Sequence, residues 1–149
     1  MKKIAIFNFL LCIVCTMLIT TVMAQDAKEK ELHEKLSQHH QKAAEHAKAI
    51  STGGVTSKAD QQKKAEELDQ SLQAAKKTAG ELKTNQKGKH ESTHKTIESH
   101  HKDAATHVNA LKEELKKPNP DNTKIKDHAE KAHTAIQKAE EEHKKTKGG

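Results

Sequence analysis

The chain has 149 residues, of which 27 are Lys or Arg, 21 are Asp or Glu and 12 are His, so its formal net charge is +6. It contains no Arg, Trp or Tyr, and its lysines are interleaved with acidic residues along most of the length. Nucleic-acid-binding proteins usually carry a one-sided basic stripe with arginine or stacking aromatic residues. We therefore expect no nucleic-acid partner.

The first predicted element is a secretory signal peptide over 1–24. Two lysines precede an apolar run over 4–22, and Ala24 ends a small-residue cleavage site. We expect cleavage between Ala24 and Gln25, and export to the periplasm or the extracellular space. The alternative is an uncleaved membrane anchor, because the apolar run is nearly long enough to span a bilayer.

Cleavage would change the composition. Both Cys, all three Met and both Phe lie within 1–24, whereas all 12 His lie beyond it. Loss of the two leading lysines would lower the net charge from +6 to +4. A mature chain of this kind has no disulfide, no thiolate catalysis, no cysteine-based zinc site and no haem attached through a C-x-x-C-H motif.

The segment 25–149 is predicted to be a single helical domain. It has few large aliphatic residues, which predicts a thin, alanine-rich core. Its abundant Ala, Glu, Lys and Gln favour helix, and the low net charge argues against full disorder. Partial disorder in the absence of a ligand is the alternative.

Three breaks divide this segment: Gly53-Gly54, the stretch 84–88, and Pro118-Asn119-Pro120. Because the connections are short, they favour antiparallel neighbours in an up-down-up-down four-helix bundle with coiled-coil-like seams. Ser57 and Asp121 are plausible N-caps. The predicted helices lie near 26–51, 57–83, 89–117 and 121–146.

One histidine pattern occurs twice. His33-x5-His39-His40-x5-His46 recurs 61 residues later as His94-x5-His100-His101-x5-His107. A scarce residue type repeated in register at four positions indicates an internal repeat. We interpret it as a duplicated helical hairpin that carries imidazoles at set positions.

Alternating steps of three and four along each helix put several histidines on the inward, apolar seams. Buried polar groups need hydrogen-bond partners, and coordination of a metal ion would supply them. The alternatives are ordinary core histidines with satisfied ring nitrogens, or a splayed, hydrated seam. The seam histidines are His33, His40, His90, His94, His101 and His143.

The hairpin geometry predicts two levels of ligands. His33, His90, His94 and His143 are expected at one end of the bundle, and His40 with His101 at a second level that lacks a third ligand on the second or fourth helix. Nitrogen ligands of this kind suit Zn(II), Cu(II) or Ni(II). Carboxylates near the histidines in sequence are expected to orient the rings. They are Glu29, Glu98 and Asp103.

Residues 90–94 also match the H-E-x-x-H motif of zinc peptidases. The motif lacks the further G-x-x-H ligand pattern of the metzincins, and no substrate cleft is indicated. A bis-histidine haem between His40 and His101 is disfavoured, because an alanine-rich core without aromatic residues offers little apolar pocket. We predict that the protein is not an enzyme.

The sequence thus predicts an exported, histidine-rich helical protein that binds a divalent transition metal for buffering, sequestration or delivery. The rival hypothesis is a structural or interaction bundle of the cell envelope that binds no metal and responds to pH. Expected partners are a metal ion and either a second copy of the chain or an envelope protein. Contact with a membrane is expected only through an uncleaved signal segment.

Overall fold

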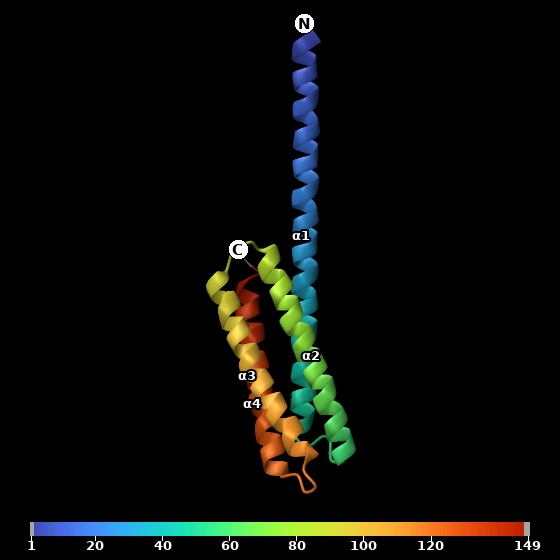
Figure 1. Ribbon diagram of the computed structural model, residues 1–149, viewed down its shortest axis with the longest axis vertical. Coiled ribbons are helices and arrows are strands. Elements are labelled where there is room, and N and C mark those ends of the chain that lie inside the picture. The colour runs from blue at the N-terminus through green and yellow to red at the C-terminus, as the bar shows by residue number, and fades with distance from the viewer. Residues whose placement is uncertain (1, 148–149) are drawn as a thin grey trace.

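The computed structural model describes the backbone of residues 2–147 and the side chains of 24–147, and it is a bundle of four helices. The helices are α1 (Lys2–Ser51), α2 (Lys58–Asn85), α3 (Glu91–Lys116) and α4 (Asn122–Lys145). Successive helices alternate in direction (Figure 1). α1 and α3 each pack against α2 and α4, so α1 and α3 occupy opposite corners of the bundle. The predicted all-α, up-down-up-down bundle is confirmed.

α1 is one continuous helix from Lys2, whereas the first helix of the domain was predicted to begin near residue 26. No Gly or Pro interrupts residues 2–51, so nothing in the backbone chemistry breaks the helix there. Its N-terminal half extends beyond the other three helices (Figure 1). The predicted signal peptide, 1–24, lies outside the residues with described side chains except for Ala24.

Across the part of the chain with described side chains, none of the helices combines the length and the apolar character needed to cross a membrane.

The predicted N-caps of α2 and α4 are confirmed. The Ser57 hydroxyl accepts a hydrogen bond from the backbone N–H of Asp60 at 3.0 Å, and the Asp121 carboxylate accepts one from the N–H of Thr123 at 2.9 Å. These bonds satisfy N–H groups that lack a partner within the helix. After α1, Gly53 adopts φ +75°, a left-handed conformation that glycine enters without strain.

The connection between α2 and α3 differs from the prediction. α2 continues to Asn85, two residues beyond the expected end, and Gln86 forms its C-cap. Lys87, Gly88 and His90 then have positive φ angles of 46°, 86° and 57°, which turn the chain before α3 begins. His90 is therefore the N-cap of α3 and lies outside the helix proper.

The predicted seams form the core. Alanines supply much of it, together with a few leucines and isoleucines, as expected for a thin core. One apolar cluster involves all four helices. A second, small cluster at the end near Gln86 comes only from α1 and α2. On the side of α3 and α4, this end also contains buried polar side chains, which lie beside Ile97 and Ala139. The members of the small cluster are Leu32, Leu36, Ala75 and Leu82.

Candidate metal centre

Five of the six predicted seam histidines are buried at the same end of the bundle, with exposed fractions of 8% or less. α1 contributes two of them, α3 two and α4 one. The sixth, His90, precedes α3 and is half-buried. The buried five are His33, His40, His94, His101 and His143.

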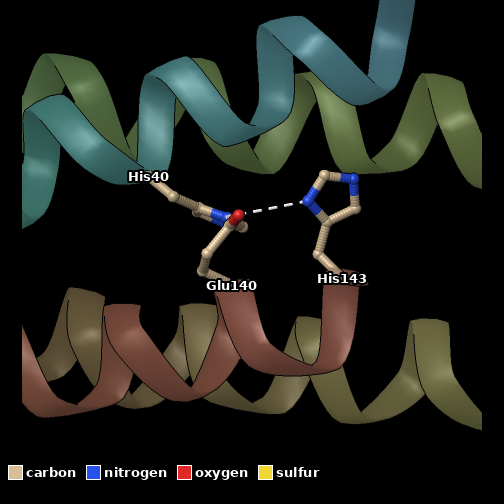
Figure 2. Close-up of side chains that lie close together, drawn as sticks. All are labelled: His40, Glu140 and His143. Atoms are coloured by element: carbon tan, nitrogen blue, oxygen red, sulfur yellow. Dashed lines mark hydrogen bonds and ion pairs between the residues drawn. The ribbon is translucent and has the colours of Figure 1, made fainter. Parts of the chain in front are cut away.

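The centre of this polar region is the carboxylate of Glu140 on α4. Its Oε2 atom lies 2.8 Å from Nδ1 of His40 and 3.2 Å from Nδ1 of His143, and its Oε1 atom accepts a hydrogen bond from the Ser37 hydroxyl at 2.9 Å. Figure 2 shows the three side chains meeting between α1 and α4. One ligand atom from each of His40, Glu140 and His143 can be chosen so that all three lie within 4.8 Å of one another.

Two further imidazoles extend the group. His40 Nε2 lies 2.7 Å from His101 Nε2, and His143 Nε2 lies 2.8 Å from His33 Nδ1. The rings of His33 and His143 are stacked, with centroids 5.1 Å apart. Each of the two histidines on Glu140 therefore has a second histidine on its other ring nitrogen.

A single set of neutral tautomers satisfies these contacts. An ionised carboxylate only accepts, so both His40 and His143 donate to Glu140 through Nδ1–H. Their Nε2 atoms are then acceptors, and His101 and His33 donate to them through Nε2–H and Nδ1–H respectively. This assignment follows from the hydrogen-bond network, because hydrogen positions are inferred from heavy-atom geometry.

A second polar group lies next to His33, around the amide of Gln86 at the C-cap of α2. Its Nε2 atom donates to Glu29 Oε1 at 2.8 Å and to the carbonyl of Thr146 at 3.3 Å, and lies 3.5 Å from Nε2 of His33. Its Oε1 atom lies 2.6 Å from His94 Nε2. The two groups together form one polar layer that reaches all four helices.

The environment favours the neutral form of four of the five buried imidazoles. Burial lowers the pKa of His33, His94 and His143, and it lowers the pKa of His101 to about 3, with a further contribution from His40. Neutral imidazole is the form that binds metal ions.

Glu140 remains ionised inside this layer. Burial by itself raises the pKa of the carboxyl group, but hydrogen bonds from His143, His40 and Ser37 outweigh that effect and hold the pKa well below its usual range. The layer therefore contains an ionised carboxylate in direct contact with imidazole rings.

The two halves of the repeat contribute unequally. His40 and His101 are equivalent in the repeat, as are His33 and His94. Aligning the buried seams of α2 and α4 matches Leu72 with Ile136 and Ala75 with Ala139. The same alignment matches Lys76 with Glu140 and Ala79 with His143. His40 consequently faces a carboxylate, whereas the positive charge of Lys76 further lowers the pKa of His101.

Two surface cavities reach the polar layer and offer routes for an ion. One, of about 310 Å³ between α1 and α4, is lined by Ser37, His40 and Glu140 among others. The other, of about 210 Å³ between α2 and α3, is lined by His94 and His101. A built metal site needs such an entry path.

The expectation that the level of His40 and His101 lacks a third ligand was wrong. Glu140 follows the seam residue Ala139 directly, so helix periodicity alone put it at the edge of the seam, and only the approach of α1 turns it inward. Gln86 was missed because it lay in a predicted loop. For Glu140, the available signal was its position three residues before the seam histidine His143.

The three carboxylates expected to orient imidazole rings have different positions. Glu29 lies 3.7 Å from Nε2 of His33, one turn along α1. Glu98 lines the cavity that contains His94 and His101. Asp103 instead lines a separate surface groove with His100 and His107, away from the polar layer.

The H-E-x-x-H segment does not have the arrangement seen in zinc peptidases. His90 is the N-cap of α3 and has a left-handed backbone, so the two histidines do not both lie within the helix as the motif requires. Glu91, the residue that would be the general base, forms ion pairs with Lys83 and Lys95.

The chain matches no protein-family model, no curated protein and no solved structure.

Proposed function

We propose that this is an exported protein that binds a divalent transition-metal ion through His40, Glu140 and His143, for buffering, sequestration or delivery. The observation that carries the proposal is the convergence of two imidazole nitrogens and one carboxylate from α1 and α4 within 4.8 Å of one another. Two histidines and a carboxylate are an established ligand set for zinc.

The spacing is close to what an ion requires. Zinc–nitrogen bonds of about 2.0–2.1 Å place tetrahedral ligand atoms about 3.3 Å apart. The present separations from Glu140 Oε2 are 2.8 Å to His40 and 3.2 Å to His143, so the carboxylate would have to move only slightly from each ring nitrogen. Imidazole and carboxylate ligands suit Zn(II), Ni(II) and Cu(II), and without a thiolate or thioether the site has no preference for Cu(I).

The next histidines in the network would support the ligands. When Nδ1 of His40 and of His143 binds an ion, Nε2 carries the proton of each neutral ring. Those Nε2–H groups would donate to Nε2 of His101 and Nδ1 of His33, which lie 2.7 and 2.8 Å away and become acceptors when these two rings take the other neutral tautomer. Partners of this kind fix the orientation and tautomer of a ligating histidine. Binding rather than catalysis fits this arrangement, because the ligand atoms are enclosed between helices and face only a narrow groove.

The test is a titration of purified, metal-free protein with Zn(II) against a competing chelator. Glu140→Gln keeps the shape of the side chain and removes its charge, so this variant should lose one equivalent of bound zinc. Glu142→Gln is the matched control, because Glu142 lies two residues away on α4 and pairs with Lys145. Equal binding by wild type and Glu140→Gln would rule out the site.

A second candidate function is supported by the completeness of the hydrogen-bond network without an ion. With the neutral tautomers described above, every bond among His33, His40, His101, His143 and Glu140 has one donor and one acceptor. We therefore also consider an envelope interaction or structural bundle that binds no metal and loosens on acidification. In that case zinc and chelator should leave the unfolding transition unchanged, whereas lowering the pH should make the protein unfold more easily.

A further inference from the structure

The buried NH₂ group of Gln86 lies among acceptor atoms that would also bind a cation. Gln86 is only 3% exposed, and its NH₂ group is surrounded by three acceptors, two on α1 and one at the end of α4. These are the carboxylate of Glu29 at 2.8 Å, the backbone carbonyl of Thr146 at 3.3 Å and Nε2 of His33 at 3.5 Å. Such a ring of acceptors around one buried donor is also a ligand set for a positive ion.

The dimensions of this set fit a transition metal. The Gln86 amide atom is 2.8 Å from Glu29 Oε1 and 3.5 Å from His33 Nε2, and the latter two atoms are 3.7 Å apart. A point equidistant from the three atoms lies about 2.0 Å from each, which matches zinc–nitrogen and zinc–oxygen bond lengths. The triangle would therefore accept an ion with little movement of the backbone.

One local change would convert the set into a site. Rotation of the Gln86 amide by about half a turn exchanges its oxygen and nitrogen, which have nearly the same shape. Oε1 would then face Glu29 and His33, and the NH₂ group would face His94, whose ring nitrogen can accept. The carbonyl of Thr146 would be a fourth ligand.

We propose a second divalent-cation site formed by Glu29, His33, Gln86 and Thr146 at the open end of the bundle. We call it the outer site, and the site at His40, Glu140 and His143 the inner site. With one imidazole and three oxygen donors, the outer site suits a borderline ion such as Zn(II) more than a soft one. It shares no ligand with the inner site, and its existence does not depend on the proposed function.

The two sites are nevertheless neighbours. His33 presents Nε2 to the outer site, and its Nδ1 atom lies 2.8 Å from Nε2 of His143, an inner-site ligand. The imidazole ring of His33 thus lies between the outer site and the inner site. Occupation of the outer site requires Nε2 of His33 to be free of a proton, which is the tautomer that the hydrogen-bond network assigns while the inner site is empty. An ion at the inner site leaves the proton of His143 on Nε2, so binding of both ions breaks the hydrogen bond between His33 and His143.

The experiment counts Zn(II) ions bound per chain, by competition with a chelator, on protein purified from cells that express the full chain. Wild type should bind two ions, the second more weakly than the first, because binding of both breaks the His33–His143 hydrogen bond. Glu29→Gln should bind one, and Glu31→Gln, an exposed position on the same helix, should still bind two. Glu140→Gln should also bind one, because it disables the inner site alone. Far-UV dichroism of each variant confirms that helix content is retained.

The outcomes separate the two proposals. One ion in wild type, unchanged by Glu29→Gln and lost in Glu140→Gln, would overturn the outer site and leave the proposed function intact. One ion lost in Glu29→Gln and kept in Glu140→Gln would support the outer site and overturn the proposed function.

A gain-of-affinity variant gives a second test that does not depend on loss of structure. Gln86→Glu places a carboxylate where the amide oxygen is expected to bind, so zinc affinity of the outer site should rise tenfold or more. The imidazole ¹⁵N spectrum should show the change at Nε2 of His33. An unchanged affinity and an unchanged His33 signal on zinc addition would overturn the outer site.

Discussion

Nε2 of His40 and Nε2 of His101 lie 2.7 Å apart across the diagonal between α1 and α3. The two residues hold the same place in the two halves of the repeat. A ring N–H on one must donate to the bare nitrogen of the other, so each half of the chain supplies the partner that the other half needs. Duplication of a histidine-bearing hairpin thereby provides a way to bury imidazoles without leaving them unsatisfied.

The contact between these rings predicts a loss of stability when one is removed. His101→Ala should lower the free energy of unfolding by roughly 2–4 kcal/mol, because it leaves a cavity and deprives His40 of its donor. Urea denaturation of the metal-free protein measures the change. His100→Ala, at the half-buried neighbouring position, should shift it by no more than about 0.5 kcal/mol. Equal effects of the two substitutions would contradict the role of the diagonal pair.

Stability should fall on acidification through the histidine range. The folded-state pKa of His101 is lowered to about 3 from an ordinary value of 6.5, so the unfolded chain binds protons first. The stabilisation is complete above about pH 6.5 and declines progressively toward the folded pKa. His101 alone would lose on the order of 2 kcal/mol between pH 6.5 and 5. Chemical denaturation of metal-free protein at several pH values tests this, and His101→Gln should show a shallower dependence.

Lys76 is the counterpart of Glu140 in the other half of the repeat. Lys76→Glu would put a carboxylate in the cavity that contains His94 and His101, and would remove a charge that lowers the pKa of His101. We expect the pKa of His101 to rise in this variant. Imidazole proton chemical shifts followed against pH would measure the change. The substitution Lys77→Glu, one position along α2 and outside that cavity, should leave His101 unaffected.

Two glycines should respond in opposite directions to replacement by alanine. Gly80 is exposed within α2, and a Cβ there meets nothing within 4 Å, so Gly80→Ala should stabilise the fold by roughly 0.5–1 kcal/mol. Gly53 has φ +75°, where a side chain is strained, so Gly53→Ala should destabilise it. Thermal unfolding of both variants provides the comparison. A destabilising Gly80→Ala would mean that α2 is distorted at this position.

Bound metal should raise stability by mass action. At free Zn(II) one hundred times the dissociation constant, one site that exists only in the folded state adds about 2.7 kcal/mol to the free energy of unfolding. The melting temperature should rise with zinc and return to its original value with chelator. Glu140→Gln should reduce this rise, whereas Glu142→Gln should not. An identical rise in both variants would point to zinc bound away from the inner site.

The sequence was sufficient to predict the helices and most of the inward positions. Glycine and proline mark the ends of α1 and α3, Ser57 and Asp121 cap the helices that follow, and the apolar periodicity identifies the buried seams. The error at His90 has a local cause. The positive φ angles of Lys87 and Gly88 delay the start of α3, and residue types alone gave no sign that a lysine would take this conformation.

Periodicity and residue type, which are local properties of a helix, thus determined that histidines face the interior and that the chain repeats. Which atoms meet depends on the rotation and height of helices distant in sequence. Glu140 lies at the edge of a seam and becomes half-buried only because α1 packs beside α4. Gln86 lies in a connection and becomes buried only because α2 ends among the other three helices. The tertiary structure alone therefore decided that a carboxylate joins His40 to His143 and that a buried amide joins Glu29 to His94.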